Sequence, residues 1–90
     1  MSAPTPTIDE LLTQRDLLCA QAHEKRAESY SLDARAAEVE AEIRERAGYG
    51  YESRAHENAR HYREMAQVYR TLADRCRAGA AKRTGQRALA

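Results

Sequence analysis

The sequence contains no tryptophan and no phenylalanine, and only four glycines, two prolines and two cysteines among its 90 residues. Two cysteines are too few for a disulfide framework, which excludes a small domain stabilised mainly by cystines. Both prolines precede Thr7, so glycine is the only strong helix breaker in the rest of the chain. Glutamate, alanine, arginine and leucine dominate that remainder, a composition typical of long helices.

Long apolar runs are also missing. The longest is Leu17-Leu18-Cys19-Ala20, far shorter than the roughly 18 residues that suggest a membrane-spanning helix. The first residues show no basic stretch followed by an apolar one, so no secretory signal is predicted. From these absences we expect a soluble, cytoplasmic protein.

The net charge of +1 conceals an asymmetry between the two halves of the chain. Residues 1–50 hold six basic and ten acidic residues, a net of −4, which leaves +5 for residues 51–90. Charges of opposite sign attract when two helices fold antiparallel, and they help to set orientation in coiled coils. The charge distribution therefore favours two helices that lie against each other.

Local signals divide the chain into two helices. Thr7 and Glu10 form a capping box, which predicts a helix over residues 7–47. Gly48-Tyr49-Gly50 predicts a turn, and a second helix is expected over residues 51–78, ended by Gly79. Residues 1–6 are predicted to be a flexible leader and residues 79–90 a flexible basic tail. The predicted fold class is all-α, a coiled-coil-like antiparallel hairpin of two helices that oligomerisation completes to a helical bundle.

Each predicted helix carries a seam of residues spaced by three and four, the spacing of a heptad repeat. We interpret these two seams as the surfaces that face each other, in a register with Leu32 opposite Tyr62 and Leu18 opposite Cys76, or in an alternative register shifted by about half a heptad. The first seam comprises Ile8, Leu11, Arg15, Leu18, Ala22, Lys25, Ser29, Leu32, Ala36, Val39 and Ile43, and the second Tyr51, Ala55, Asn58, Tyr62, Met65, Tyr69, Leu72 and Cys76.

The two predicted helices differ in length, and this difference points to an interface. A second helix that ends near Ala78 leaves the start of the first helix with no partner from its own chain, and that start is rich in leucine. Exposed contiguous apolar patches usually mark interaction sites. We therefore predict self-association, as a dimer, or capture by another protein through Ile8, Leu11, Leu12, Leu17 and Leu18.

Few residues suggest other chemistry. Cys19 and His23 share a helix face, and Cys76 should approach them in the hairpin, so a thiol or metal switch is a weaker alternative. No nucleophile motif, phosphate loop or dinucleotide fingerprint is present, and we expect neither an enzyme nor a cofactor.

The C-terminal end offers another alternative function, because its basic residues are accompanied by no acidic ones. Such a cluster can contact phosphates without reading sequence, which would suit an accessory protein that binds nucleic acid. The candidate contacts are Arg75, Arg77, Lys82, Arg83 and Arg87. The main prediction remains a small, non-catalytic helical module for protein–protein interaction, acting as an adaptor, a regulator or an inhibitor.

Overall fold

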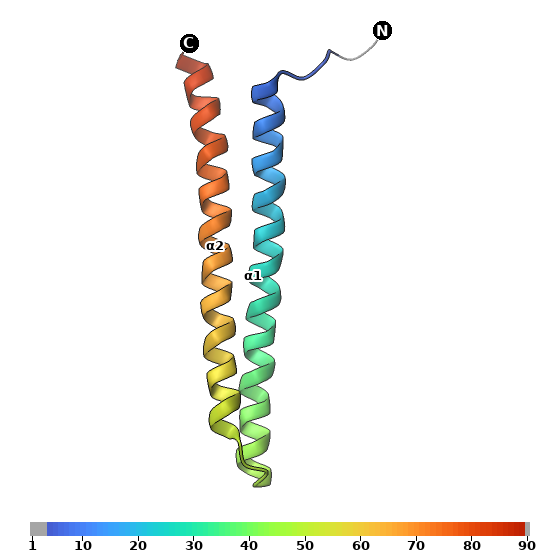
Figure 1. Ribbon diagram of the computed structural model, residues 1–90, viewed down its shortest axis with the longest axis vertical. Helices are drawn as coiled ribbons and strands as arrows, with labels where there is room; N and C mark the ends of the chain where they lie inside the picture. The colour runs from blue at the N-terminus through green and yellow to red at the C-terminus, as the bar shows by residue number, and fades with distance from the viewer. Residues whose placement is uncertain (1–3, 90) are drawn as a thin grey trace.

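The computed structural model describes the backbone of residues 4–89 and the side chains of residues 4–85. Two helices, α1 (Ile8–Ala47) and α2 (Glu52–Leu89), lie side by side and antiparallel, joined by one tight turn (Figure 1). The predicted all-α helical hairpin is confirmed. Neither helix, within the described residues, has an apolar stretch long enough to cross a membrane.

Local hydrogen bonds define both ends of α1. The Glu10 amide donates to the Thr7 hydroxyl at 3.1 Å, which satisfies one of the unpaired amides of the first turn. At the other end Gly48 adopts a left-handed conformation with φ 71°, and the Tyr49 amide donates to the Arg44 carbonyl at 3.0 Å. The chain reverses here because glycine adopts this conformation without the steric cost that a side chain adds.

The second helix is longer than predicted. The expectation that Gly79 ends it is wrong, because α2 continues through Gly79 to Leu89. A glycine inside a helix costs about 1 kcal/mol relative to alanine, but here packing against α1 opposes that cost. A Cβ placed on Gly79 would lie 3.4 Å from Oδ2 of Asp16, and Ala80 is buried directly after it. Contacts with α1 therefore extend past the predicted break.

The core between the helices consists of alanine. Every buried hydrophobic residue of the described chain is an alanine, each at most 6% exposed, and none of the larger side chains is fully buried. Such small side chains allow two helix backbones to approach closely. Four lie on α1 and five on α2, and all but Ala55 follow a spacing of seven residues within their helix: Ala20, Ala27, Ala34 and Ala41, then Ala55, Ala59, Ala66, Ala73 and Ala80. We call these nine residues the alanine rows.

The predicted first seam faces away from α2, which corrects the interpretation above. Leu18 and Leu32 are 64% and 63% exposed, so they do not pack on Cys76 or Tyr62 as the first register requires. The second seam does lie near the contact, since its tyrosines at 62 and 69 are half-buried. Hydrophobicity predicts that the heptad of larger residues faces inward on α1, whereas the structure places the alanines there.

Ion pairs between the helices identify the register. Glu24 pairs with Arg77 and Glu38 pairs with Arg63, and the residue numbers of each pair add to 101. The Arg70 guanidinium also donates to the Ser31 hydroxyl at 2.8 Å, again with numbers that add to 101. These contacts correspond to the alternative register, and they join acidic groups of α1 to basic groups of α2 as the charge asymmetry predicts.

Candidate functional site

The most prominent surface feature is a line of exposed aliphatic side chains along α1. Each member is between 47% and 76% exposed, and together they extend over most of the helix. Exposed alanines at positions 22 and 36 lie between them, with Arg15, Lys25 and Ser29 as the polar interruptions. We call this surface the outer face of α1, and its large members are Ile8, Leu11, Leu18, Leu32, Val39 and Ile43.

The helical repeat explains why this face is exposed. At about 100° per residue, the second and fifth positions after each row alanine lie about 200° and 140° around the helix from it. After Ala27 these positions are Ser29 and Leu32, and after Ala34 they are Ala36 and Val39. The outer face is therefore opposite the alanine row, and α2 cannot cover it.

The predicted interface at the start of α1 is part of this surface. Ile8, Leu11 and Leu18 belong to the outer face, Leu17 is exposed beside it, and Leu12 is half-buried. The predicted gap opposite this segment does not exist, because α2 continues to Leu89 and extends alongside it. The leucines are exposed because they lie on the far side of α1, and the apolar surface continues to Ile43, well beyond the segment predicted.

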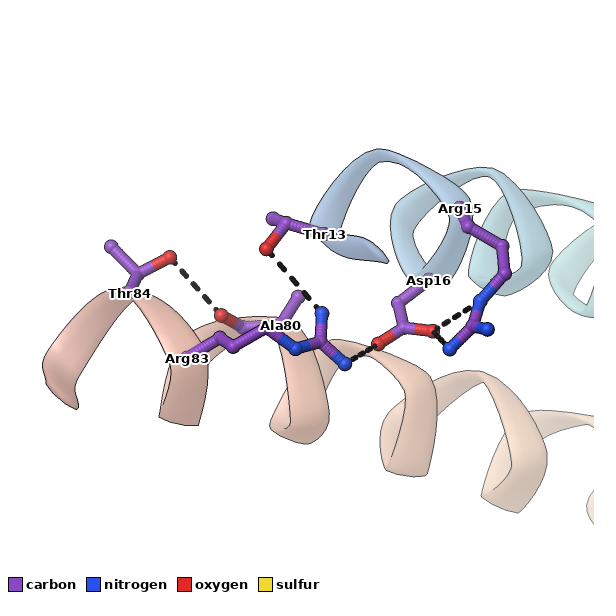
Figure 2. Close-up of polar contacts among 6 residues, drawn as sticks. All are labelled: Thr13, Arg15, Asp16, Ala80, Arg83 and Thr84. Atoms are coloured by element: carbon purple, nitrogen blue, oxygen red, sulfur yellow. Dashed lines mark hydrogen bonds and ion pairs between the residues drawn. The ribbon is translucent and has the colours of Figure 1, made fainter. Parts of the chain in front are cut away.

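A polar cluster fastens the open end of the hairpin. Nη2 of Arg83 lies 2.6 Å from Oδ2 of Asp16, and Nη1 of Arg83 donates to the Thr13 hydroxyl at 3.4 Å (Figure 2). Arg15 holds the other carboxylate oxygen at 3.0 Å, and the Asp16 side chain is only 14% exposed. The hydrogen bond from Arg83, followed by that from Arg15, lowers the pKa of Asp16 below its usual 3.8, although partial desolvation opposes the change.

The lowered pKa predicts how the stability depends on pH. A carboxyl group whose pKa is depressed by folding stabilises the folded chain above its unfolded pKa, and loses this effect as the pH falls through the folded value. We expect Asp16→Asn to reduce the melting temperature at pH 7, with a difference from the wild type that shrinks below about pH 4. Thermal melts followed by circular dichroism between pH 2 and 7 measure this difference.

Asp33→Asn is the matched control for this prediction. It removes the same charge from an exposed position of α1 that makes no ion pair within the described residues. Its melting temperature should therefore remain close to that of the wild type. A gap between Asp16→Asn and the wild type that stayed constant down to pH 2 would contradict the assignment.

Aromatic rings line one side of the contact between the helices. The Tyr30 ring stacks on Tyr69 with centroids 5.6 Å apart and on Tyr62 with centroids 6.2 Å apart. The His23 ring lies 5.7 Å from that of Tyr69, and the Arg26 guanidinium lies 5.8 Å from the same ring. These rings pack against one another between the two helices, beside the alanine rows.

The five basic residues near the C-terminus have different surroundings. Arg77 pairs with Glu24 and Asp74, and Arg83 pairs with Asp16, so both take part in interactions within the hairpin. Arg75 and Lys82 are exposed on α2. The side chain of Arg87 lies outside the described residues. The predicted cluster is therefore divided between structural ion pairs and solvent-exposed cations.

The three residues of the candidate thiol or metal site differ in exposure and in contacts. Cys19 is exposed, Cys76 is half-buried, and both are free thiols. His23 packs against Tyr69, as described above. In the described part of the chain, no three histidine, cysteine, aspartate or glutamate side chains gather in an arrangement that could hold a metal ion.

Comparison of this chain with protein-family models, with curated proteins and with solved structures finds no match. The functional argument therefore depends on the surfaces of the hairpin itself. The outer face of α1 is the surface that sequence reasoning recognised only in part. The signal that could have identified it is the pair of alanine rows, which repeat every seven residues on both helices and mark the inward faces.

Proposed function

We propose that this chain is a non-catalytic interaction module, which binds a helix of another protein molecule along the outer face of α1. The observation that supports this proposal is the outer face itself, six large aliphatic side chains between 47% and 76% exposed in a heptad pattern. A helix with apolar residues in a heptad pattern packs against another helix by inserting these side chains between those of the partner. An adaptor, a regulator or an inhibitor would use such a surface.

Energetic considerations support the same proposal. Burial of apolar area contributes about 25 cal/mol per Å², so exposed aliphatic side chains represent stabilisation that the isolated hairpin does not obtain. The hairpin core, in contrast, consists of methyl groups. A partner helix on the outer face would bury the large side chains that the alanine core leaves exposed.

Site-specific photo-crosslinking in the native host tests the proposal. A photoreactive residue at Leu32, in the outer face, is expected to yield covalent adducts with another protein molecule, which is either a second copy or a different protein. The matched control places the same residue at Glu64, which is exposed on the side of α2 that faces away from α1. Adducts at both positions in equal yield, or none at Leu32, would reject the outer face as a binding surface.

A further inference from the structure

The order of residues along the outer face of α1 is nearly the same in both directions from Lys25. Leu18 and Leu32 lie seven residues to either side of it, and Leu11 and Val39 lie fourteen residues to either side. The other members keep the spacing to within one residue: Ala22 corresponds to Ser29 and Ile8 to Ile43, whereas Arg15 corresponds to Ala36, which differs in size and charge. The face is thus close to a palindrome centred on Lys25.

Such a pattern is what a two-fold interface requires, because in a symmetric dimer the same patch must be complementary to itself. We propose that the outer face of α1 binds the same face of a second copy of this chain, antiparallel, about a two-fold axis near Lys25. This inference depends on the proposed function and names its partner. Leu18 of one copy then packs on Leu32 of the other, and Leu11 packs on Val39.

The antiparallel direction follows from the polar members of the face. In a parallel arrangement Arg15 would lie against Arg15 and Lys25 against Lys25, which places like charges together in two layers. In the antiparallel arrangement Arg15 faces the small Ala36, and only Lys25 lies opposite its own copy. Glu28 of the second copy is then about one turn from that Lys25, where its carboxylate can pair with the ammonium group of the first. One unfavourable layer is therefore removed.

Among the residues whose side chains the structure describes, no other face of the hairpin offers a matching apolar partner. In that part of the chain the outer face of α2, at the same positions relative to its alanine row, has Val68 as its only large exposed hydrophobic residue. Its remaining described members are Arg54, Glu57, His61, Glu64, Thr71, Arg75, Ala78, Lys82 and Gly85. Of the described surfaces of a second copy, its own α1 is therefore the one that can cover the outer face of α1 with aliphatic side chains.

The surface area supports an interface of ordinary size. The chain exposes 7087 Å², whereas a folded monomer of 10.2 kDa typically exposes about 5,300 Å². The excess, roughly 1,800 Å² per chain, is more than the roughly 800 Å² that each partner buries in a typical stable protein–protein interface. Because the outer face lies opposite α2, the dimer would place four helices in a row, with the two α1 helices at its centre.

Engineered disulfides test the pairing and its direction. In a background with Cys19→Ser and Cys76→Ser, cysteine is introduced as Leu18→Cys, as Leu32→Cys, or as both. The two positions lie about 21 Å apart along one helix, so no disulfide can join them within a single chain. We expect covalent dimers from the double variant and from an equimolar mixture of the single variants. Each single variant alone should stay monomeric on a non-reducing gel.

Sedimentation equilibrium of the native sequence gives an independent measurement. We expect a dimer, with a dissociation constant that rises at least about tenfold in Leu18→Glu because a charge enters the centre of an apolar layer. Val68→Glu, which adds the same charge on α2, is the matched control and should leave the dissociation constant unchanged. Leu18 is largely exposed within the hairpin, and unchanged helicity by circular dichroism will confirm that Leu18→Glu still folds.

Two results would overturn the inference. The first is a native chain that remains monomeric at millimolar concentration, and the second is covalent dimer formation by each single cysteine variant as readily as by the mixture. If the native chain is monomeric while Leu32 still captures a different protein by photo-crosslinking, the outer face remains a binding surface and only its assignment to a second copy fails. If Leu32 captures nothing, the proposed function fails as well.

Discussion

Ala66→Leu is expected to lower the free energy of unfolding by about 1–3 kcal/mol, the usual cost of forcing extra methylene groups into a packed interior. Ala66 is 1% exposed and lies in the middle of the alanine row of α2. Leucine and alanine both favour the helix, so the substitution changes the space between α1 and α2 far more than it changes the stability of α2 alone. Urea denaturation followed by circular dichroism measures the free energy.

Ala36→Leu is the matched control, because Ala36 is exposed on the outer face of α1. There the added side chain meets no neighbour within the hairpin, and we expect a change of less than about 0.5 kcal/mol. If the dimer proposed above forms, the same substitution enlarges its apolar face, so the two variants are compared at concentrations at which the chain is monomeric. Equal destabilisation by Ala66→Leu and Ala36→Leu would indicate a loss of helix propensity and would contradict a close-packed alanine contact.

Local signals in the sequence predicted the hairpin because their causes are local. The Thr7 hydroxyl reaches the Glu10 amide within one turn, and Gly48 ends α1 by its own conformational freedom. Neither effect needs a distant partner, so a reading of neighbouring residues suffices. Gly79 is different, because the local cost of glycine is opposed by contacts of the surrounding segment with α1, such as the ion pair between Arg83 and Asp16, which are more than sixty residues apart in the chain.

The inward face of α1 could not be identified from hydrophobicity. Two heptad patterns run along this helix, one of large aliphatic residues and one of alanines, and burial of area favours the larger residues. The structure places Ala34 inward and Leu32 outward. The difference arises because close approach of two backbones needs small residues on both helices. On α2, Ala59, Ala66 and Ala73 are spaced by seven and match the row of alanines on α1.

The choice of alanine for the core links the fold to the candidate site. A hairpin that buried Leu18 and Leu32 would have a larger hydrophobic core but no apolar face to present. With alanine inward, the two helices pack closely through small side chains, and the leucines remain exposed on the outer face of α1. The isolated hairpin is therefore expected to be marginally stable, and the proposed binding along the outer face would add stability by mass action, since only the folded chain presents that face.

The aromatic contacts then provide much of the specific packing between α1 and α2, and Tyr30 is their centre. Its ring is nearly parallel to that of Tyr69, with an interplanar angle of 12°, and it also stacks on Tyr62. We expect Tyr30→Ala to lower the free energy of unfolding by about 2 kcal/mol, less than the 3–5 kcal/mol typical of a fully buried aromatic residue because Tyr30 is only half-buried.

A double-mutant cycle separates stacking from loss of apolar area. We expect the effects of Tyr30→Ala and Tyr69→Ala to be non-additive, with a coupling energy of about 0.5–1.5 kcal/mol, the range found for aromatic pairs. Tyr49→Ala removes the same ring from an exposed turn position and should change stability little. Additive effects of Tyr30→Ala and Tyr69→Ala would mean that each ring packs independently beside the alanine rows, and that stacking of the two rings does not join the helices.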